Sequence, residues 1–265
     1  MPLRIATWNV NSLKARLEKL EGWLAYAQPD VVCLQETKMA DAAFPAMAFT
    51  ALGYEAAHHG NGRWNGVAIL SRVGLDDVVA GFSHAEEDPE VESRLLSATC
   101  GGVRVSSVYV PNGRQVGTEH FEAKLRWLDD LRRHLADTCD PEGKVVVCGD
   151  FNVAPDDRDV WDPRKANGGT HVTVEERAAL AALEAWGLQD AFRLHHQGDR
   201  LFSWWDYRAG DFHKHKGMRI DLVLASRPLA EVCTFALIDR QARKGKSPSD
   251  HAPLVVDFAI EPEPS

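Results

Sequence analysis

The sequence is short of positive charge and of long apolar runs. Its 265 residues include 30 Lys and Arg against 39 Asp and Glu, a formal net charge of −9. That balance excludes a uniformly basic coat for nucleic acid, although a local basic rim on an acidic surface stays compatible with it. No apolar run approaches the ~20 residues that a membrane-spanning helix needs. We therefore expect no membrane association.

Paired cysteines are also absent. The five cysteines are odd in number and form no C-x-x-C motif. Two of them, Cys33 and Cys148, lie in apolar runs and are expected in the core. This usage favours a reducing compartment. The first residues lack a basic region followed by an apolar stretch, so we predict no signal peptide and a cytoplasmic protein.

Length and composition are ordinary for a folded protein, with 45% hydrophobic and 26% charged residues. No repeat or linker interrupts the chain. We predict a single domain over residues 1–260 and a flexible tail at 261–265.

Apolar residues at helical spacing predict three helices. The first covers residues 13–27 with Asn11 or Ser12 as N-cap, and the second covers 121–135. The third opens with a capping box at Thr173 and Glu176 and ends near Gly187. Short apolar runs predict strands at 3–8, 31–35, 67–71, 95–100, 103–110, 144–148, 220–225 and 254–260. Several of these runs lack alternation, and Gly101-Gly102 indicates a hairpin. The pattern predicts an α/β fold of stacked mixed sheets with helices outside.

Polar residues follow several of these apolar runs. They are Asn9, Glu36, Asp150, Asn152, Asp221, Asp250 and His251. Carboxylate and amide oxygens at one sheet edge suit a hard divalent cation and leave groups to act as a base and to polarise a phosphate. Each motif alone has an ordinary structural explanation. Glu36 could simply pair with Lys38, and Asn9 could simply form a turn.

The G-D-F-N motif is the stronger of these signals. If the chain is extended there, Asp150 and Asn152 lie on the same side of the backbone. One could then activate water while the other hydrogen-bonds a phosphoryl oxygen. The alternative is a common D-x-N turn.

A second signal is the imidazole of His251 directly after the carboxylate of Asp250, although a lone histidine is more often a packed or surface residue than a catalyst. Asp221 could orient this ring and favour its protonated form, which would neutralise charge on a phosphorane-like centre. Tyr109 and Asn112 could contact phosphate, although the P-N-G sequence by itself favours a plain turn. The aromatic stretch 202–208 has cations nearby and suits a nucleotide surface, while tryptophans in a strand are commonly core residues.

In this order and at these separations, the motifs closely resemble the exodeoxyribonuclease III family of the endonuclease/exonuclease/phosphatase superfamily. The match runs nearly end to end. It includes W-N-V-N-S at 8–12, L-Q-E-T-K at 34–38, N-G-V-A-I-L-S at 65–71, Y-V-P-N-G at 109–113, G-D-F-N at 149–152, F-S-W-W-D-Y-R at 202–208, R-I-D at 219–221 and S-D-H-A-P at 249–253.

The resemblance implies a four-layered sandwich of two packed mixed β-sheets flanked by helices. It also implies Mg²⁺, with Mn²⁺ as an alternative, and a monomer acting on double-stranded DNA that is abasic or 3′-blocked. The implied activities are incision 5′ to abasic sites, 3′→5′ exonuclease and removal of 3′-blocking groups. The segment 156–170 varies within that family, which leaves the balance of these activities open.

Carried over by position, the resemblance gives each residue a role. The implied metal site comprises Asn9, Glu36, Asp150, Asn152, Asp250 and His251. The implied catalytic residues are Tyr109, Asp150, Asn152, Asp221 and His251, with Asp150 activating water and Asp221 orienting His251. The predicted DNA contacts are Lys38, Arg94, Asn112, Trp204, Met218 and Arg219. The three cations among them are candidates for a local basic cluster. Trp204 lies in a motif that matches the family's pocket-lining stretch, and Met218 lies three residues before Asp221, so both are expected at a pocket for the abasic sugar.

Two other functions are compatible with parts of this pattern. A phosphoesterase of the same superfamily could act on a non-DNA substrate, but the W-W-D-Y-R and R-I-D motifs are typical of the DNA-repair branch. A catalytically silent DNA-end binding module would need a lost ligand or base, and none of the polar residues named above is missing.

Overall fold

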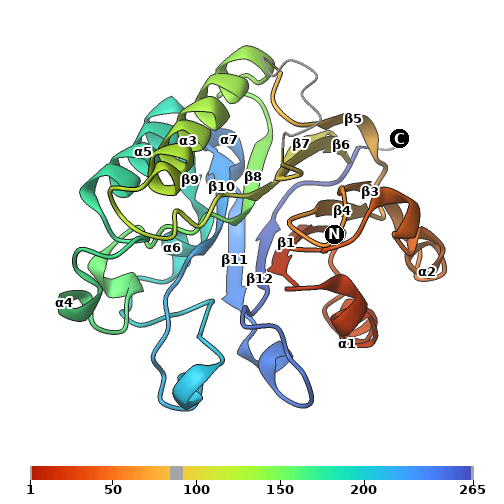
Figure 1. Cartoon of the computed structure of the whole chain (residues 1–265). Helices are drawn as coiled ribbons and strands as arrows, with labels where there is room; N and C mark the ends of the chain where they lie inside the picture. The colour runs from red at the N-terminus through yellow and green to blue at the C-terminus, as the bar shows by residue number, and fades with distance from the viewer. Residues whose placement is uncertain (1, 84–91, 264–265) are drawn as a thin grey trace.

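The computed structural model describes residues 2–83 and 92–263 and contains two six-stranded mixed sheets that pack face to face (Figure 1). The first sheet has the spatial order β11 (Cys233–Ile238), β12 (Leu254–Phe258), β1 (Leu3–Asn9), β2 (Val31–Gln35), β4 (Val67–Ser71) and β3 (Glu55–His59). The second has the order β5 (Asp76–Ala80), β6 (Leu95–Cys100), β7 (Val103–Tyr109), β8 (Val145–Asp150), β10 (Asp221–Ser226) and β9 (Leu188–Asp190). Each sheet contains one parallel pair of strands. It is β1 with β2 in the first sheet and β7 with β8 in the second.

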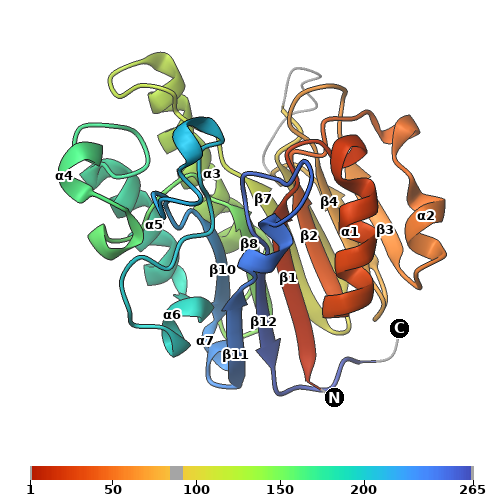
Figure 2. The ribbon, with the colours of Figure 1, turned by 90° about the horizontal axis from the view of Figure 1, so that it is seen from below.

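Helices cover both outer faces of this pair of sheets. They are α1 (Leu13–Ala27), α2 (Ala46–Thr50), α3 (Glu119–Thr138), α4 (Pro163–Ala166), α5 (Val174–Trp186), α6 (Ala191–His195) and α7 (Arg227–Ala230). In Figures 1 and 2, α1 and α2 lie outside the first sheet, and α3 and α5 lie outside the second. The four-layered sandwich implied by the resemblance is therefore confirmed.

Three apolar cores correspond to the spaces between the four layers. Val146 and Cys148 of β8 face the core between the sheets, whereas Val145 and Val147 face the core beneath α3 and α5. A third core joins the first sheet to α1. Because β8 is covered on both faces, its apolar run shows no alternation, as predicted.

Turn and cap chemistry agrees with the sequence at most positions. Thr173 and Glu176 form the predicted capping box of α5, and Gly101-Gly102 links β6 to β7 with φ of 55° and 77°. Ser12 is the N-cap residue of α1, but its side chain makes no capping hydrogen bond. The turn before α1 is held instead by backbone hydrogen bonds, because the Ser12 N–H donates to the Glu36 carbonyl at 2.7 Å and the Leu13 N–H donates to the Thr37 carbonyl at 3.0 Å.

Residues 261–263 run beside the β6–β7 hairpin. The Glu263 N–H donates to the Gly101 carbonyl at 3.0 Å, and the Glu263 carboxylate pairs with Lys144 at 2.7 Å. The rest of the predicted tail, 264–265, lies outside the described residues. The single-domain assignment and the flexible tail stay predictions. Among the described helices, none combines the length and apolar character needed to cross a membrane.

Candidate active site

The polar strand ends predicted from the sequence meet at one edge of the two sheets. Asn9 ends β1 and Asp150 ends β8, while Asp221 begins β10 directly opposite Asp150. Glu36 follows β2, and His251 lies three residues before β12. In Figure 2, the loops that precede β10 and β12 lie beside the start of α1 at this edge.

The amide of Asn9 lies at the centre of the site. Its Nδ2 donates to Glu36 Oε1 at 2.9 Å and to Asp150 Oδ2 at 3.0 Å, and the Asn9 side chain is fully buried. Glu36, Asp150 and His251 each offer a ligand atom within 4.8 Å of the others. The two carboxylates provide the oxygen donors that a hard divalent cation prefers. The donor chemistry therefore fits Mg²⁺ or Mn²⁺.

Lys38 also contacts this cluster. Its Nζ lies 2.8 Å from Glu36 Oε2 and donates to Asn11 Oδ1 at 2.5 Å. The ion pair that the sequence allowed as an alternative role for Glu36 is therefore present. It accompanies the Asn9 contact, so Glu36 belongs to the cluster as well.

Asp150 is almost completely buried, with 2% of its surface exposed. Burial, together with the nearby charges of Asp221 and Glu36, raises the pKa of Asp150 to about 7, although His251 and the Asn152 N–H oppose the rise. A carboxyl with this pKa can exchange a proton near neutral pH. A bound divalent cation would favour its ionised form.

His251 and Asp221 form a buried pair. The imidazole Nδ1 lies 2.8 Å from Asp221 Oδ2 and 3.1 Å from Oδ1. Burial alone would lower the pKa of His251, but the charges of Asp221 and Asp150 outweigh it and raise the pKa to about 10. The ring is therefore an imidazolium at neutral pH, with Nε2 3.8 Å from Asp150 Oδ2. An imidazolium has no free lone pair, which favours a proton donor over a metal ligand.

Backbone and side-chain contacts fix the position of this pair. The Trp8 indole donates to the His251 carbonyl at 3.1 Å. The Ser203 hydroxyl accepts from the Asp221 N–H at 3.1 Å, and the Ser203 carbonyl accepts from Ala252 N–H at 2.7 Å. Ser203 thus ties β10 to the segment after His251. Ser203 lies in the F-S-W-W-D-Y-R motif, but the motif does not reveal this role.

Asp250 is held at the margin of the site. Its Oδ1 accepts from Asn11 Nδ2 at 2.9 Å and its Oδ2 accepts from the Trp204 indole at 3.1 Å. Trp204 pairs with Met218 through backbone hydrogen bonds of 2.9 and 3.0 Å, and both side chains pack on one small apolar cluster. Trp204 and Met218, two of the predicted DNA contacts, are therefore neighbours, and Trp204 also contacts Asp250.

Asn152 does not follow the extended geometry predicted for G-D-F-N. Its φ is 51°, and its N–H donates to Asp150 Oδ1 at 2.9 Å, so the alternative D-x-N turn is what forms. The Asn152 amide donates to the Val110 carbonyl at 3.0 Å and accepts from Asn112 at 3.2 Å. The turn therefore links the end of β8 to the chain that follows β7.

Gly149 is required where β8 approaches β7. A Cβ at this position would lie 1.9 Å from the Val108 carbonyl oxygen, and the backbone φ is 155°.

Left-handed backbone occurs at Asn11, Glu36 and Lys38, with φ of 44°, 51° and 53°. Such conformations are sparsely populated by non-glycine residues and cluster at functional sites.

Tyr109 ends β7 and is paired with Asp150 of the neighbouring strand β8. Burial and the charges of Glu36 and Asp150 raise the pKa of Tyr109 well above its ordinary value, so its hydroxyl stays a proton donor. Arg94 lies 4.6 Å over the Tyr109 ring and forms an ion pair with Glu92. Only 9% of Arg94 is exposed, so contact with DNA would involve an edge of its guanidinium.

Arg219 is not placed to contact DNA. Its side chain is fully buried and donates to Asp159 at 2.7 Å and to Asp190 at 2.6 Å. Both carboxylates lie inside the fold, so this guanidinium supports the β9–β10 region. The prediction that Arg219 contacts DNA is therefore wrong. Arg219 is one of the cations near the aromatic stretch 202–208, and its role is structural.

A buried lysine beneath the site was missed. Lys124 of α3 is fully buried and forms an ion pair with Glu176 of α5. Its Nζ donates to the Asn152 carbonyl at 2.6 Å and to the Asn112 carbonyl at 3.3 Å. Burial alone would raise the pKa of Glu176, but the charge of Lys124 lowers it. The sequence does contain a signal for this buried ion pair, because Lys124 lies on the face of α3 that is otherwise formed by apolar residues such as Phe121 and Leu128.

Comparison with known proteins gives the family. The family model described as Endonuclease/Exonuclease/phosphatase family matches residues 6–251. The chain belongs to this family. It is 35% identical over 268 residues to exodeoxyribonuclease III of Haemophilus influenzae, covering 97% of this chain and 100% of the relative. It is a nuclease of the exodeoxyribonuclease III type, as the sequence motifs implied.

Solved structures of nucleases and of a 3′ phosphatase have the same fold as this chain. An AP endonuclease from Archaeoglobus fulgidus has a TM-score of 0.93 and 37% identity, covering 97% of this chain and 100% of that one. A variant of the 3′ phosphatase NExo from Neisseria, bound to product DNA hairpin, has a TM-score of 0.94 with the same identity and coverage. These three relatives are named for different activities: exodeoxyribonuclease, AP endonuclease and 3′ phosphatase.

Proposed function

We propose that this family member hydrolyses phosphate esters in double-stranded DNA with a divalent cation, incising 5′ to abasic sites and trimming or unblocking 3′ ends. The observation that carries the proposal is the buried Asn9–Glu36–Asp150 cluster beside the Asp221–His251 imidazolium. The relatives named above support DNA as the substrate. A non-DNA phosphoesterase lacks this support, and a silent binding module would not retain every catalytic group.

The proposed metal is Mg²⁺, with Glu36 and Asp150 as its protein ligands. When bound, it would polarise a phosphoryl oxygen and offset negative charge. Asn9 holds the two carboxylates in place because its amide NH2 donates one hydrogen bond to each of them. Asp250 is not in the group of converging ligand atoms formed by Glu36, Asp150 and His251. The Asn152 amide donates to the Val110 carbonyl. We therefore propose supporting roles for Asp250 and Asn152.

The remaining residues have complementary roles on the phosphate. The His251 imidazolium donates a hydrogen bond through Nε2–H to a phosphoryl oxygen, and Asp221 maintains the charge of the ring. Tyr109 donates through its hydroxyl, and the exposed amide of Asn112 contacts the same group or its neighbour. Asp150, which a bound cation would keep ionised, accepts the proton of the attacking water. The P–O bond to the leaving oxygen breaks, and that oxygen takes up a proton from solvent.

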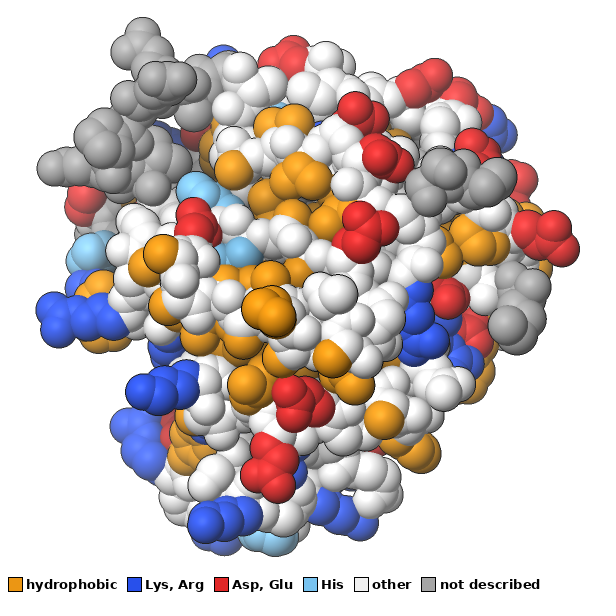
Figure 3. All heavy atoms as spheres, turned by 90° about the vertical axis from the view of Figure 1, so that its right-hand side faces the viewer, with side chains coloured by type: hydrophobic (Ala, Val, Ile, Leu, Met, Phe, Trp, Pro, Cys, Tyr) orange, Lys and Arg blue, Asp and Glu red, His pale blue; other side chains and the backbone are white. Residues whose placement is uncertain are grey.

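DNA would contact a basic rim on an acidic protein. On the face shown in Figure 3, Lys and Arg side chains are most frequent at the left and lower edges, and most acidic side chains lie in the upper part. Exposed cations in the segment before His251 are Arg240, Lys244 and Lys246. Lys38 is partly exposed at the site itself. All groups of the site come from one chain and the five cysteines are free, so we propose a monomer in the cytoplasm.

The decisive assay uses purified protein with Mg²⁺ and three labelled duplexes: one with an abasic analogue, one blunt and undamaged, and one with a 3′-phosphate. We expect products from at least one duplex, loss of cleavage in excess EDTA and recovery on adding Mg²⁺ or Mn²⁺. Undiminished cleavage in EDTA would contradict the metal assignment. No cleavage of any duplex, with hydrolysis of a non-DNA phosphate ester, would move the function to the other branch of the superfamily.

Trp204 provides a prediction about lesion recognition. Trp204→Phe should keep the apolar contact with Met218 but lose the indole donor to Asp250. We expect little change in melting temperature and about tenfold slower abasic-site incision, the scale of one lost hydrogen bond to a charged group. The rate on the blunt duplex should fall less. Equal losses on both duplexes would contradict a role for Trp204 in lesion recognition.

A further inference from the structure

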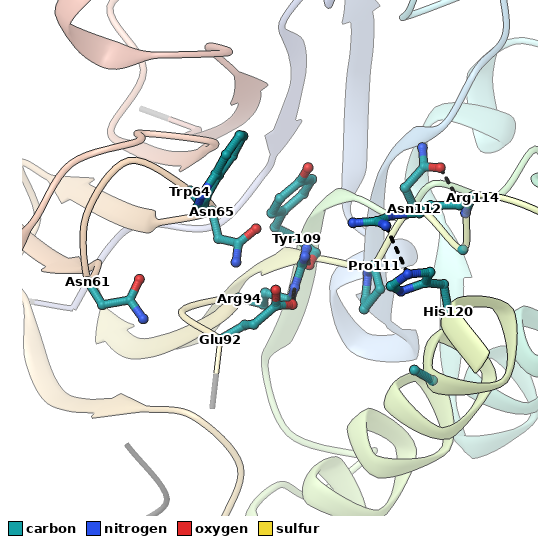
Figure 4. Close-up of a pocket in the computed structure, with 12 residues that line it drawn as sticks. Asn61, Trp64, Asn65, Glu92, Arg94, Tyr109, Pro111, Asn112, Arg114 and His120 are labelled. Atoms are coloured by element: carbon teal, nitrogen blue, oxygen red, sulfur yellow. Dashed lines mark hydrogen bonds and ion pairs between the residues drawn. The ribbon is translucent and has the colours of Figure 1, made fainter. Parts of the chain in front are cut away.

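An open cleft of about 540 Å³ extends from the active site across the junction of the two sheets (Figure 4). One wall comes from the chain between β3 and β4, with Asn61, Trp64 and Asn65. The other comes from the chain between β7 and α3, with Pro111 and Arg114, and from the first turn of α3, with His120. Tyr109 and Asn112, which we propose contact the phosphate, lie in the cleft as well. Its volume falls within the ~300–1,000 Å³ typical of ligand sites.

Trp64 is the unusual residue of this cleft. Its side chain is 65% exposed, whereas Trp8 and Trp205 of the same chain are fully buried. In Figure 4 the Trp64 ring stands at the rim and points to the same side as the Tyr109 ring. The Arg63 guanidinium lies 5.5 Å from the Trp64 ring centroid. An exposed indole with an adjacent cation is a stacking surface suited to an anionic aromatic ligand.

The opposite wall supplies polar groups that suit a sugar–phosphate chain. Arg114 and His120 lie 2.8 Å apart through Nη1 and Nε2, and the Arg114 N–H donates to Asn112 Oδ1 at 3.1 Å. Both side chains are exposed, and the charge of Arg114 acts on Glu92, a residue of the same cleft whose carboxylate pairs with Arg94. The cleft therefore has an aromatic surface on one wall, a cation on the other and phosphate-contacting groups at one end.

We propose that this cleft binds one unpaired nucleotide next to the cleaved phosphate, with its base stacked on Trp64 and its phosphate facing Arg114. The inference rests on the proposed action on DNA. A base inside a duplex is stacked on both faces, whereas an unpaired base has a face free for the indole. The cleft thereby favours substrates with a frayed, mismatched or overhanging nucleotide beside the reactive bond.

The test measures binding in EDTA, so that hydrolysis does not interfere. Two duplexes each carry one unpaired 2-aminopurine, on the 5′ or on the 3′ side of the target phosphate, and a third is fully paired. With the wild type we expect a change of 2-aminopurine fluorescence on one of the two unpaired duplexes. Trp64→Ala should abolish it and weaken that complex about tenfold, which corresponds to the stacking of one base.

Matched variants separate stacking from general damage. Trp64→Phe should restore most of the fluorescence change because it keeps a ring. Tyr26→Ala removes another exposed aromatic, 76% exposed on α1, and should behave as wild type. Arg114→Gln should weaken all three complexes and lower their salt dependence by about one phosphate contact.

The outcomes also distinguish this inference from the proposed function. If the wild type cleaves DNA with Mg²⁺ but Trp64→Ala alters neither unpaired duplex more than the paired one, the cleft inference is wrong and the nuclease function stands. If the wild type neither binds nor cleaves any duplex, the proposed function itself fails.

Discussion

His251→Ala and Asp221→Ala should each lower kcat about 1,000-fold, and the double variant should be little worse than either single one. The imidazolium exists at neutral pH because Asp221 lies 2.8 Å from Nδ1, so removing either member removes the same charged donor. Residues that act as one unit show such non-additive losses. The measurement is single-turnover cleavage by the three variants on one duplex, with melting temperatures recorded alongside.

A pH profile tests the electrostatic part of this pairing. Asp221 helps to raise the pKa of His251 to about 10, so the protonated ring is lost only as pH rises through that value. Asp221→Asn keeps a hydrogen-bond partner but removes the charge, which lowers the pKa of His251. The alkaline limb of the variant's profile should therefore move to lower pH. Losses that simply multiply, with an unmoved alkaline limb, would show that the two residues act independently.

The sequence predicted the interior of the fold better than its margins. Every strand that the sequence analysis missed, namely β3, β5, β9 and β11, is an edge strand of its sheet. Such a strand has a neighbour on one side only and need not be apolar on both faces. All five residues of β5 are exposed, for example, so nothing in Asp76–Ala80 distinguishes it from a loop. The missed helices have only four or five residues, too few to show a helical period.

The site was predictable where chemistry is carried by residue type. Asn9, Glu36, Asp150, Asp221 and His251 were named from motifs, and the structure places them together. Local conformation was less predictable, because the left-handed φ of Asn152 depends on contacts with Val110 and Asn112, which lie about forty residues away in the chain. Arg219 was misread for a related reason. Its partners Asp159 and Asp190 are brought to it only by the tertiary fold.

Lys124→Met should destabilise the protein by about 3–5 kcal/mol, because it leaves the Glu176 carboxylate buried without its cation. The wild-type pair is fully buried on both sides. Adding Glu176→Gln should recover part of the loss, because no buried charge then remains unpaired, although the amide oxygen can accept from only one of the His171 and Thr173 N–H groups that the two carboxylate oxygens bind. Denaturant unfolding of the two single variants and the double variant gives these values. Arg126→Met, which breaks an exposed pair with Glu119 on the same helix, should hardly change stability.

Activity should not recover with stability. In the double variant, the carbonyls of Asn112 and Asn152 lose the ammonium that holds the end of β8 against the chain after β7. The Asn112–Asn152 contact at 3.2 Å would then depend on the two side chains alone. We expect kcat to stay about tenfold low with a nearly normal KM, because a small displacement of catalytic groups slows chemistry more than binding. If stability and kcat return together, Lys124 serves only the fold. If stability returns without kcat, a buried lysine that touches no substrate sets the geometry of the residues that do.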